Sequence, residues 1–184
     1  YSVTVKTSPR YVNENCTACG DCEKVCDTEV SNEFNFGMDR RKAAYLPHNL
    51  AFPMRYVMDP AMSTDDRDKV KEACQYDAVD FDMEEKTFEL KVGAVVWNTG
   101  WTPYDATKID NLGFGRYQNI VTNMMLERMA SLNGPTAGKI VRPSDDKAPE
   151  TIAFAQCAGS RDENHLSYCS YICCMASLKH ATYL

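Results

Sequence analysis

The chain has 184 residues, 44% of them hydrophobic and 10% aromatic, and a formal charge of −6 from 20 basic and 26 acidic side chains. This size and hydrophobicity allow one large domain or two small ones with a real core, and they exclude a disordered chain. The acidic balance argues against a nucleic-acid partner. The longest stretch without a charged side chain, Val92 to Tyr104, has 13 residues, which is too short for the roughly 18 of a membrane span.

The first third of the chain is predicted to begin with a strand and to contain one clear helix. Alternating residues predict a strand at Ser2 to Val5. Residues 32–60, rich in aromatic residues, proline and asparagine without a period, predict an irregular insertion. Ser63 and the acidic residue three positions later have the spacing of a capping box, so we expect a helix from Ser63 to Gln75 and then a short strand from Ala78 to Asp82.

The remainder of the chain is predicted to combine buried strands with helices. Thr87 to Trp97 alternates and then becomes apolar throughout, which indicates a strand pair or one bent, buried strand. An apolar stripe predicts a helix at Val121 to Leu132, and the breakers of Gly134 to Pro149 predict a loop or linker. A buried strand is expected at Thr151 to Gln156 and a helix at Cys169 to Leu184. Because the chain begins without Met and ends inside this helix, we expect a piece of a longer protein.

The nine cysteines fall into two groups of four, Cys16 to Cys26 and Cys157 to Cys174, with Cys74 between them. An odd number cannot be paired completely in disulfides, and no signal peptide is visible. Four cysteines within 11 residues are too dense for scattered buried thiols. The pattern therefore favours metal or iron–sulfur ligation in a reducing compartment.

The first group, Cys16, Cys19, Cys22 and Cys26, has the bacterial ferredoxin spacing C-x2-C-x2-C-x3-C. In such a run the first three thiolates hold one [4Fe–4S] cluster, and the fourth ligates the other cluster of a two-cluster protein. Zinc sites usually pair one C-x2-C with a distant second pair, so zinc is the lesser alternative. Asp27 follows the run, where ferredoxins have proline.

The second half of this ferredoxin pattern has decayed. Downstream of the first group only Cys74 fits the end of a ferredoxin half, and Arg67 and Val70 occupy two of the positions where cysteines are expected. The surviving position is the one whose thiolate ligates the first cluster.

Two ligand sets for the first cluster follow from this pattern. The preferred set joins the first three cysteines of the run to the isolated one: Cys16, Cys19, Cys22 and Cys74. In that set Cys26 is left over, because the cluster that it would bind has been lost. In the alternative set Cys26 is the fourth ligand and Cys74 is a buried thiol.

The second group, Cys157, Cys169, Cys173 and Cys174, has the spacing C-x11-C-x3-C-C. It lies on a predicted strand–turn–helix, the order of a nucleotide-binding unit, but the glycine fingerprint of such units is missing. A helix start offers positive potential to an anionic cluster. We predict a second [4Fe–4S] cluster in the place of a dinucleotide pyrophosphate. The alternative is a redox-active or inert vicinal thiol pair.

The apolar run Val92 to Trp97 leads into Thr99, Gly100 and Trp101, and this resembles a strand end of flavoproteins of the thioredoxin-reductase type, with Asn98 in place of the usual Ala. In those proteins the segment passes near the flavin where two dinucleotide-binding domains join. The resemblance implies Thr99, Gly100 and Trp101 as flavin-site residues. It also implies that FAD is bound largely by a part of the protein outside this chain.

Together with both cysteine groups, the runs Thr99 to Asp105 and Gln156 to Cys174 make nearly the whole chain similar to the A subunits of heterodisulfide reductases. This resemblance implies an α/β (α+β) fold, namely a partial two-dinucleotide-domain flavoprotein fold with a ferredoxin-like iron–sulfur insert. The implied domains are the end of the FAD-domain strand region (residues 1–12), a degenerate ferredoxin-like insert (residues 13–86), a return to the flavoprotein domain with a linker (residues 87–150), and the start of a second nucleotide-type unit (residues 151–184).

Within this family, the decayed half and the runs Arg55 to Pro60 and Arg161 to His165 are most similar to A subunits of quinone-interacting membrane-bound oxidoreductases of anaerobic sulfate reducers. The resemblance implies an oxidoreductase subunit within a redox complex. It would transfer electrons between a membrane quinone-linked partner and a cytoplasmic reductase of sulfur metabolism. It also implies a cytoplasmic chain, peripheral on the inner membrane through its partner subunits.

No residues form a catalytic acid–base set, so we predict no catalytic residue in this chain. The three histidines, His48, His165 and His180, are expected to be structural or surface groups. Two other functions remain open. One is a catalytic heterodisulfide or thiol reductase that uses Cys173 and Cys174, and the other is a structural iron–sulfur interaction module.

Overall fold

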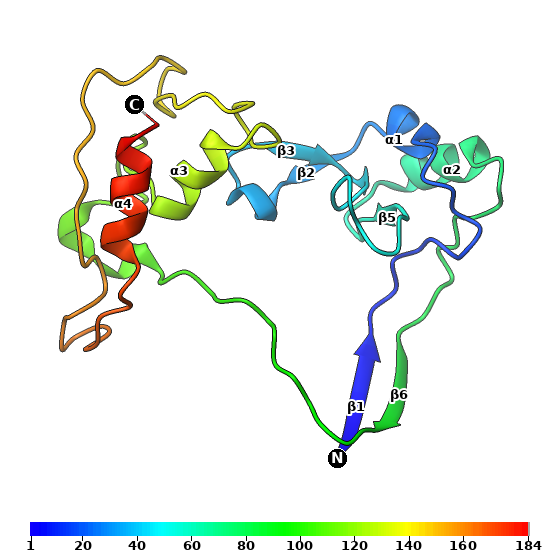
Figure 1. The fold of residues 1–184 in the computed structure, drawn as a ribbon. Helices are drawn as coiled ribbons and strands as arrows, with labels where there is room; N and C mark the ends of the chain where they lie inside the picture. Colours follow the sequence, from blue (N-terminus) through cyan, green and yellow to red (C-terminus); the bar gives the residue numbers. More distant parts are fainter. Residues whose placement is uncertain (184) are drawn as a thin grey trace. The chain divides into compact units, whose positions relative to one another are not determined.

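The computed structural model describes residues 1–183, which form two compact units (Figure 1). The first unit consists of Tyr1–Asn32 and Arg40–Asn98, and the second of Glu33–Asp39 and the residues from Thr99 onward. Both contain helices, and the strands pair in small antiparallel ladders. This mixture agrees with the predicted α+β class, and the predicted domain boundaries remain a prediction.

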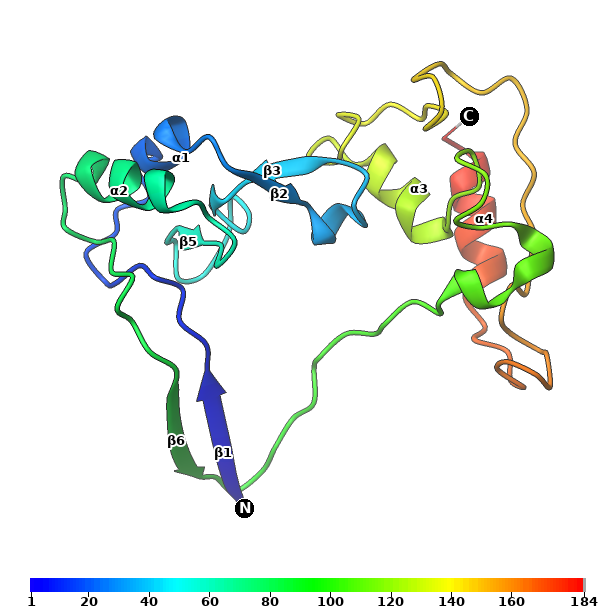
Figure 2. The ribbon, with the colours of Figure 1, turned by 180° about the vertical axis from the view of Figure 1, so that it is seen from behind.

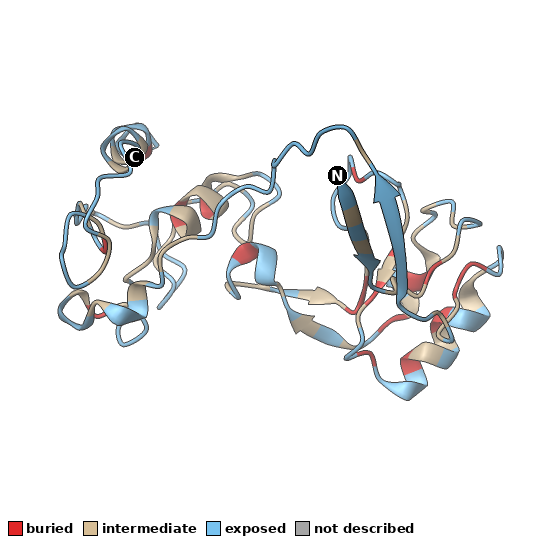
Figure 3. Ribbon diagram, turned by 90° about the horizontal axis from the view of Figure 1, so that it is seen from below, coloured by how far each residue is buried: buried red, intermediate tan, exposed pale blue. Residues whose placement is uncertain are grey.

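The first unit begins with an exposed two-stranded ladder. β1 (Ser2–Thr7) pairs antiparallel with β6 (Lys86–Lys91) along its whole length, and every residue of β6 is exposed (Figure 3). The N-terminal ammonium of Tyr1 extends the pairing by donating a hydrogen bond to the carbonyl of Val92 over 2.7 Å. The predicted first strand is confirmed, and β6 corresponds to the alternating part of the strand predicted from Thr87 to Trp97.

Two shorter ladders are formed by residues between Glu29 and Met58. β2 (Glu29–Ser31) pairs with β3 (Arg40–Lys42), and β4 (Ala44–Tyr45) pairs with β5 (Val57–Met58), both antiparallel. These strands are only two or three residues long. Residues 32–60 are therefore mostly irregular, as predicted, but they supply a folded wall for the site described below.

Two helices of the first unit lie side by side in Figures 1 and 2. α1 (Asp21–Val25) lies within the ferredoxin-like run and contains Cys22. α2 (Thr64–Ala73) begins at the N-cap Ser63, whose hydroxyl accepts a hydrogen bond from the backbone N–H of Asp66 over 3.2 Å. The predicted capped helix is confirmed, and it ends at the C-cap Cys74.

The core of the first unit includes residues of both helices and of the segments packed against them (Figure 3). The strand predicted from Ala78 to Asp82 is reduced to one antiparallel bridge between Val79 and Val12. This bridge still brings the segment after Cys74 beside the start of the cysteine run. The buried core residues are Val12, Cys22, Cys26, Ala43, Ala44, Tyr56, Met58, Met62, Val70, Ala78 and Val79.

The second unit contains two packed helices. α3 (Asn123–Ala130) begins at Thr122, whose hydroxyl caps the helix, and α4 (Cys173–Ala181) lies beside it. The helix predicted from Val121 is confirmed, and the one predicted from Cys169 starts four residues later. Leu184, the last residue of that prediction, lies outside the described residues.

The connections of the second unit are irregular. Short 3-10 turns occur at η1 (Glu33–Asn35), η2 (Ala106–Lys108) and η3 (Asp110–Leu112), and Gly134 to Pro149 is a loop, as predicted. No helix in residues 1–183 is long and apolar enough to cross a membrane.

Two predicted buried strands are wrong. Residues 92–97 form no strand, and Val96 and Trp97 are 88% and 83% exposed. Residues 151–156 are also without a strand, and Phe154 is exposed. A strand needs a neighbouring strand to bond its backbone. Val92 still bonds Tyr1, but the described part of the chain gives residues 93–97 and 151–156 no strand to pair with. Apolar composition indicates that a segment prefers to be buried, but it does not show which other segment would cover it.

Candidate metal centre

The first three cysteines of the ferredoxin-like run are held against the segment that follows Cys74. The backbone N–H of Asn13 donates to the carbonyl of Ala78 over 2.8 Å, and its side-chain amide donates to the carbonyl of Asp77 over 3.1 Å. The carbonyl of Asn13 in turn accepts a hydrogen bond from the N–H of Cys16 at 3.4 Å. One asparagine therefore joins the start of the run to the residues just beyond Cys74.

A tight turn then brings the chain into α1. Gly20 has φ +87°, a left-handed conformation that glycine adopts without strain. A Cβ at this position would lie 3.3 Å from the hydroxyl of Tyr56, so the backbone approaches the tyrosine closely. The turn places Cys22 in the first turn of α1, where it is buried.

Four cysteines line one hollow: Cys16, Cys19, Cys22 and Cys74. The other lining residues include Val12, Tyr56, Met58, Tyr76 and Val79, so the walls are largely apolar. Cys26 is not among them. The structure thus brings together the four residues of the preferred ligand set, although the ligand assignment itself remains a prediction.

The four thiols line one hollow. A [4Fe–4S] cluster takes each of four thiolates on a different iron, so its ligands surround a space, and a hollow lined by four cysteines fits that requirement. In residues 1–183, no group of three or more His, Cys, Asp or Glu side chains is placed to hold a single metal ion.

Electrostatics disfavour a free thiolate at Cys22. Burial, with a smaller contribution from negative charge on Cys16 and Cys19, raises the pKa of Cys22 to about 12. Bound iron removes this penalty, because a metal ion deprotonates its thiol ligands outright. The backbone N–H of Ala78 donates a hydrogen bond to the Sγ of Cys74 over 3.3 Å, which stabilises negative charge on that sulfur.

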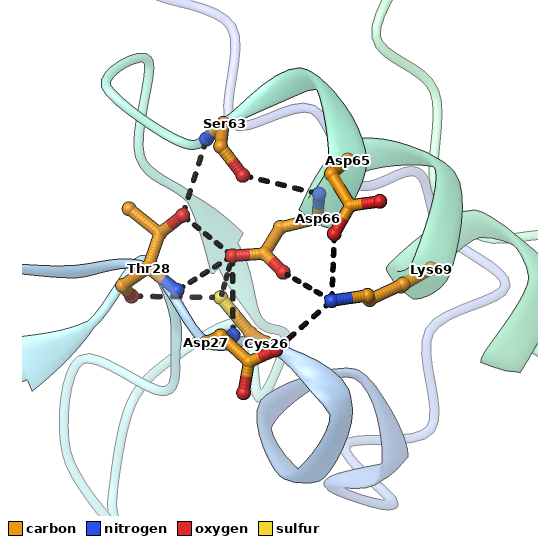
Figure 4. A network of polar contacts seen from close by, with 7 residues as sticks. All are labelled: Cys26, Asp27, Thr28, Ser63, Asp65, Asp66 and Lys69. Atoms are coloured by element: carbon orange, nitrogen blue, oxygen red, sulfur yellow. Dashed lines mark hydrogen bonds and ion pairs between the residues drawn. The ribbon is translucent and has the colours of Figure 1, made fainter.

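Cys26 lies in the core and faces a different partner (Figure 4). Its thiol donates to the carbonyl of Thr28 over 3.6 Å and to Oδ2 of Asp66 over 3.8 Å. Burial raises the pKa of Cys26, and the charge of Asp66 adds to that effect. These contacts place Cys26 outside the hollow, and its assignment as the surplus cysteine remains a prediction.

The four cysteines of the second group all lie in the second unit. Cys173 and Cys174 are the first two residues of α4, and the sulfur of Cys173 is 3.0 Å from the hydroxyl oxygen of Ser170. Cys169 precedes the helix and accepts a hydrogen bond from the N–H of Tyr171. Cys169 therefore lies outside the helix that was predicted to begin at it, because α4 starts at Cys173.

Cys157 of the second group begins a compact loop. The loop carries the positive φ angles of Cys157 and Gly159, and the guanidinium of Arg161 lies 4.0 Å from the Cys157 sulfur. The thiols of Cys157, Cys169 and Cys173 thus contact three different neighbours. The second cluster remains a prediction from spacing and resemblance.

The predicted flavin-site residues Thr99, Gly100 and Trp101 are exposed on an irregular segment, Trp101 to 66%. Their role at a flavin remains a prediction from resemblance.

Sequence reasoning did not identify two residues that border the cysteine hollow or its supports. Tyr56 lines the hollow and donates its hydroxyl hydrogen to Oε2 of Glu23 over 2.7 Å. Asp66 was recognised only as part of a helix cap, whereas its carboxylate also bonds the segment after Cys26. These contacts join residues more than 30 positions apart, and no local pattern signals them.

Curated proteins similar to this chain include the A subunits of several heterodisulfide reductases. The chain is 44% identical to the first iron–sulfur A subunit of the CoB–CoM heterodisulfide reductase of Methanopyrus kandleri, and 44% identical to the corresponding protein of Methanocaldococcus jannaschii. Each match covers 98% of this chain and 28% of the relative. The A subunit of the ferredoxin:CoB–CoM heterodisulfide reductase of Methanosarcina acetivorans is 37% identical over 99% of this chain and 27% of its own length.

Over nearly its whole length the chain is thus homologous to oxidoreductase subunits, and it spans just over a quarter of the length of these relatives. No protein-family model matches the chain. The expected resemblance to heterodisulfide reductase A subunits is confirmed. The names of these relatives mention no quinone and no sulfate reduction.

Proposed function

We propose that this chain is an iron–sulfur segment of an electron-transfer subunit in a heterodisulfide-reductase-type complex. The observation that carries the proposal is the hollow lined by Cys16, Cys19, Cys22 and Cys74. Homology to proteins named iron–sulfur subunits supports the same reading. We assign the first [4Fe–4S] cluster to these four residues, and a second to Cys157, Cys169, Cys173 and Cys174.

The residues of the first site are suited to hold such a group. The thiols supply the ligands, the apolar wall around Tyr56 and Met58 limits the access of water, and the amide of Ala78 supports the Cys74 sulfur. When bound, a cluster of this kind exchanges single electrons, whereas a flavin exchanges one or two. The protein's own task is to fix the ligands and to shape the local field.

Partners and flavin belong to the same proposal and rest on resemblance. The names of relatives describe complexes that use hydrogen, formate or ferredoxin together with a heterodisulfide, and we propose a multi-subunit redox complex here as well. A quinone-linked membrane partner and a cytoplasmic sulfur reductase are supported by the runs Arg55 to Pro60 and Arg161 to His165 alone. FAD is supported by the resemblance of Thr99, Gly100 and Trp101 to a flavoprotein strand end.

Anaerobic purification with iron, sulfide and flavin analysis tests the proposal. Two clusters predict about eight irons per chain and EPR signals that arise when dithionite is added. About four irons would overturn the second cluster, and zinc in place of iron would overturn both. Iron without any EPR change on reduction would favour a structural module. Reversible thiol labelling at Cys173 and Cys174 in the purified protein would favour the thiol-reductase alternative.

A further inference from the structure

Asp66 is a buried carboxylate in the first turn of α2, where the helix contacts the end of the cysteine run. Its side chain is 2% exposed, and Oδ2 accepts hydrogen bonds from the backbone N–H of Asp27 at 3.1 Å and from both the N–H and the hydroxyl of Thr28 (Figure 4). The thiol of Cys26 points to the same oxygen. The carboxylate therefore accepts hydrogen bonds from both residues that follow the ferredoxin-like run.

The same cluster of polar groups reaches back to the start of α2. The N–H of Ser63 donates to the hydroxyl oxygen of Thr28 over 3.2 Å, and the hydroxyl of Ser63 accepts from the N–H of Asp66. Lys69 lies at the edge, with its ammonium 2.9 Å from Asp27, 2.7 Å from Asp65 and 3.5 Å from Oδ1 of Asp66. These contacts close a network between two segments almost 40 residues apart.

The charge state of this carboxylate follows from these contacts. Burial by itself would raise the pKa of Asp66, but the hydrogen bonds from Thr28 and Asp27 and the charge of Lys69 outweigh it and lower the pKa below the usual range. Asp66 is therefore a fixed negative charge. A buried charge is costly unless it is well paired. Oδ2 of Asp66 is paired by hydrogen bonds, whereas Oδ1 has no hydrogen-bond partner and only the ammonium of Lys69 near it.

The position of the network explains why such a charge is useful. In a two-cluster ferredoxin the thiolate corresponding to Cys26 faces a second cluster. Here the cysteines of that half are replaced, and Cys26 faces Asp66 instead. The network ties the segment after Cys22 to α2, whose C-cap is Cys74. One end of α2 is thus fixed to the cysteine run, and the other end carries the isolated cysteine of the hollow.

We infer that Asp66 is a positioning residue for the first cluster, holding Cys74 in register with Cys16 to Cys22 in place of the lost second cluster. The inference rests on the proposed function. Asp66 acts in two ways: it fixes the spacing of the ligands, and its negative charge disfavours an added electron on a nearby cluster. The second effect lowers the reduction potential of the cluster, which a purely structural residue would not do.

The test compares Asp66→Asn with Asp65→Asn in the anaerobically purified protein. Asp65 is the matched control, because it lies on the same helix turn and pairs with the same Lys69 but has an exposed side chain. Asp66→Asn is expected to raise the reduction potential of the first cluster in an EPR-monitored redox titration and to speed its loss to an iron chelator several-fold. Asp65→Asn is expected to change neither.

A second pair of variants keeps the inference testable if Asp66→Asn does not fold. Thr28→Val removes a neutral hydroxyl donor and should speed iron loss, and Thr28→Ser should restore the original rate. Wild-type iron retention and potential in Asp66→Asn, or wild-type retention in Thr28→Val, would overturn the inference while the proposed function stands. A wild-type protein without iron in this hollow would instead overturn the proposed function.

Discussion

The hydroxyl oxygen of Tyr104 lies 2.5 Å from Nδ1 of His165, a residue 61 positions further along the chain. The two rings meet edge to face, and the ring of Tyr104 lies so close to Gly159 that no side chain would fit at that position. Tyr104 therefore anchors the loop that begins at Cys157. The two runs that most resemble heterodisulfide reductase A subunits are joined by this contact.

Replacing Tyr104 with Phe should loosen the Cys157 loop. The variant keeps the ring over Gly159 but loses the hydrogen bond to His165, which costs about 1 kcal/mol of local stability. We expect faster amide hydrogen exchange across residues 157–166 and faster iron loss from the second cluster. Tyr117→Phe is the control, because Tyr117 is an exposed tyrosine of the same unit. Unchanged exchange in the loop of Tyr104→Phe would contradict the anchoring role.

The ligand assignment of the first cluster is tested by exchanging two cysteines separately. Cys74→Ala should abolish the EPR signal of the first cluster and lower the iron content, because a ligand lining the hollow is removed. Cys26→Ala should retain the iron, because the Cys26 thiol faces Asp66. Its cost should be limited to about 1 kcal/mol of stability from a small cavity and a lost hydrogen bond. Iron loss on changing Cys26 but not Cys74 would favour the local ligand set.

Sequence reasoning succeeded where the determining contacts are local. The Ser63 cap and the helix after it follow from residues three positions apart, and the spacing of the cysteine run singled out Cys74, which does line the hollow with Cys16. It failed where distant contacts decide. The segment ending in Trp97 has the composition of a buried strand, but composition cannot reveal that residues 1–183 leave it unpaired.

The same limit applies to side chains with two roles. Asp66 has a recognisable place in a helix cap, yet its contact with Thr28 spans 38 residues and has no signature in either segment. Tyr56 lies in a stretch that was predicted to be irregular. The backbone there is irregular, but that prediction says nothing about where the Tyr56 side chain lies. The supporting role of such residues can be recognised only in the folded structure, where the distant segments are in contact.

Tyr56 is expected to stabilise the wall of the cysteine hollow. Burial raises the pKa of Tyr56, and its bond to Glu23 raises it further, so the hydroxyl stays a neutral donor at ordinary pH. Tyr56→Phe removes the hydrogen bond to Glu23, which follows Cys22 in α1, and should speed chelator-driven iron loss several-fold. Tyr76→Phe is the matched control, since Tyr76 also lines the hollow but is half exposed. Equal rates in the two variants would remove the proposed role of the hydroxyl.

The last prediction concerns Glu127, the carboxylate of α3 that holds the far end of α4. It accepts hydrogen bonds from Lys179 and, at 2.7 Å, from Nε2 of the buried His180. The bond from Lys179 lowers the pKa of Glu127, and that from His180 adds to it against the opposing effect of burial. Because α4 begins with Cys173 and Cys174, this contact also orients the second cysteine group.

A carboxyl group with a lowered pKa stabilises the fold above its unfolded pKa, about 4.3, and loses that contribution as the pH falls through the folded value. Glu127→Gln should therefore reduce the opening free energy of α4 by about 1 kcal/mol at neutral pH, a figure that allows for solvent screening of a partly exposed pair. The difference from wild type should shrink as the pH falls below about 4.5, where Glu127 becomes protonated. Hydrogen exchange of the α4 amides measures it, with Glu150→Gln as an exposed control in the same unit. A difference that persists unchanged down to about pH 3, where the carboxyl is protonated, would show that the Glu127 contact does not depend on its negative charge.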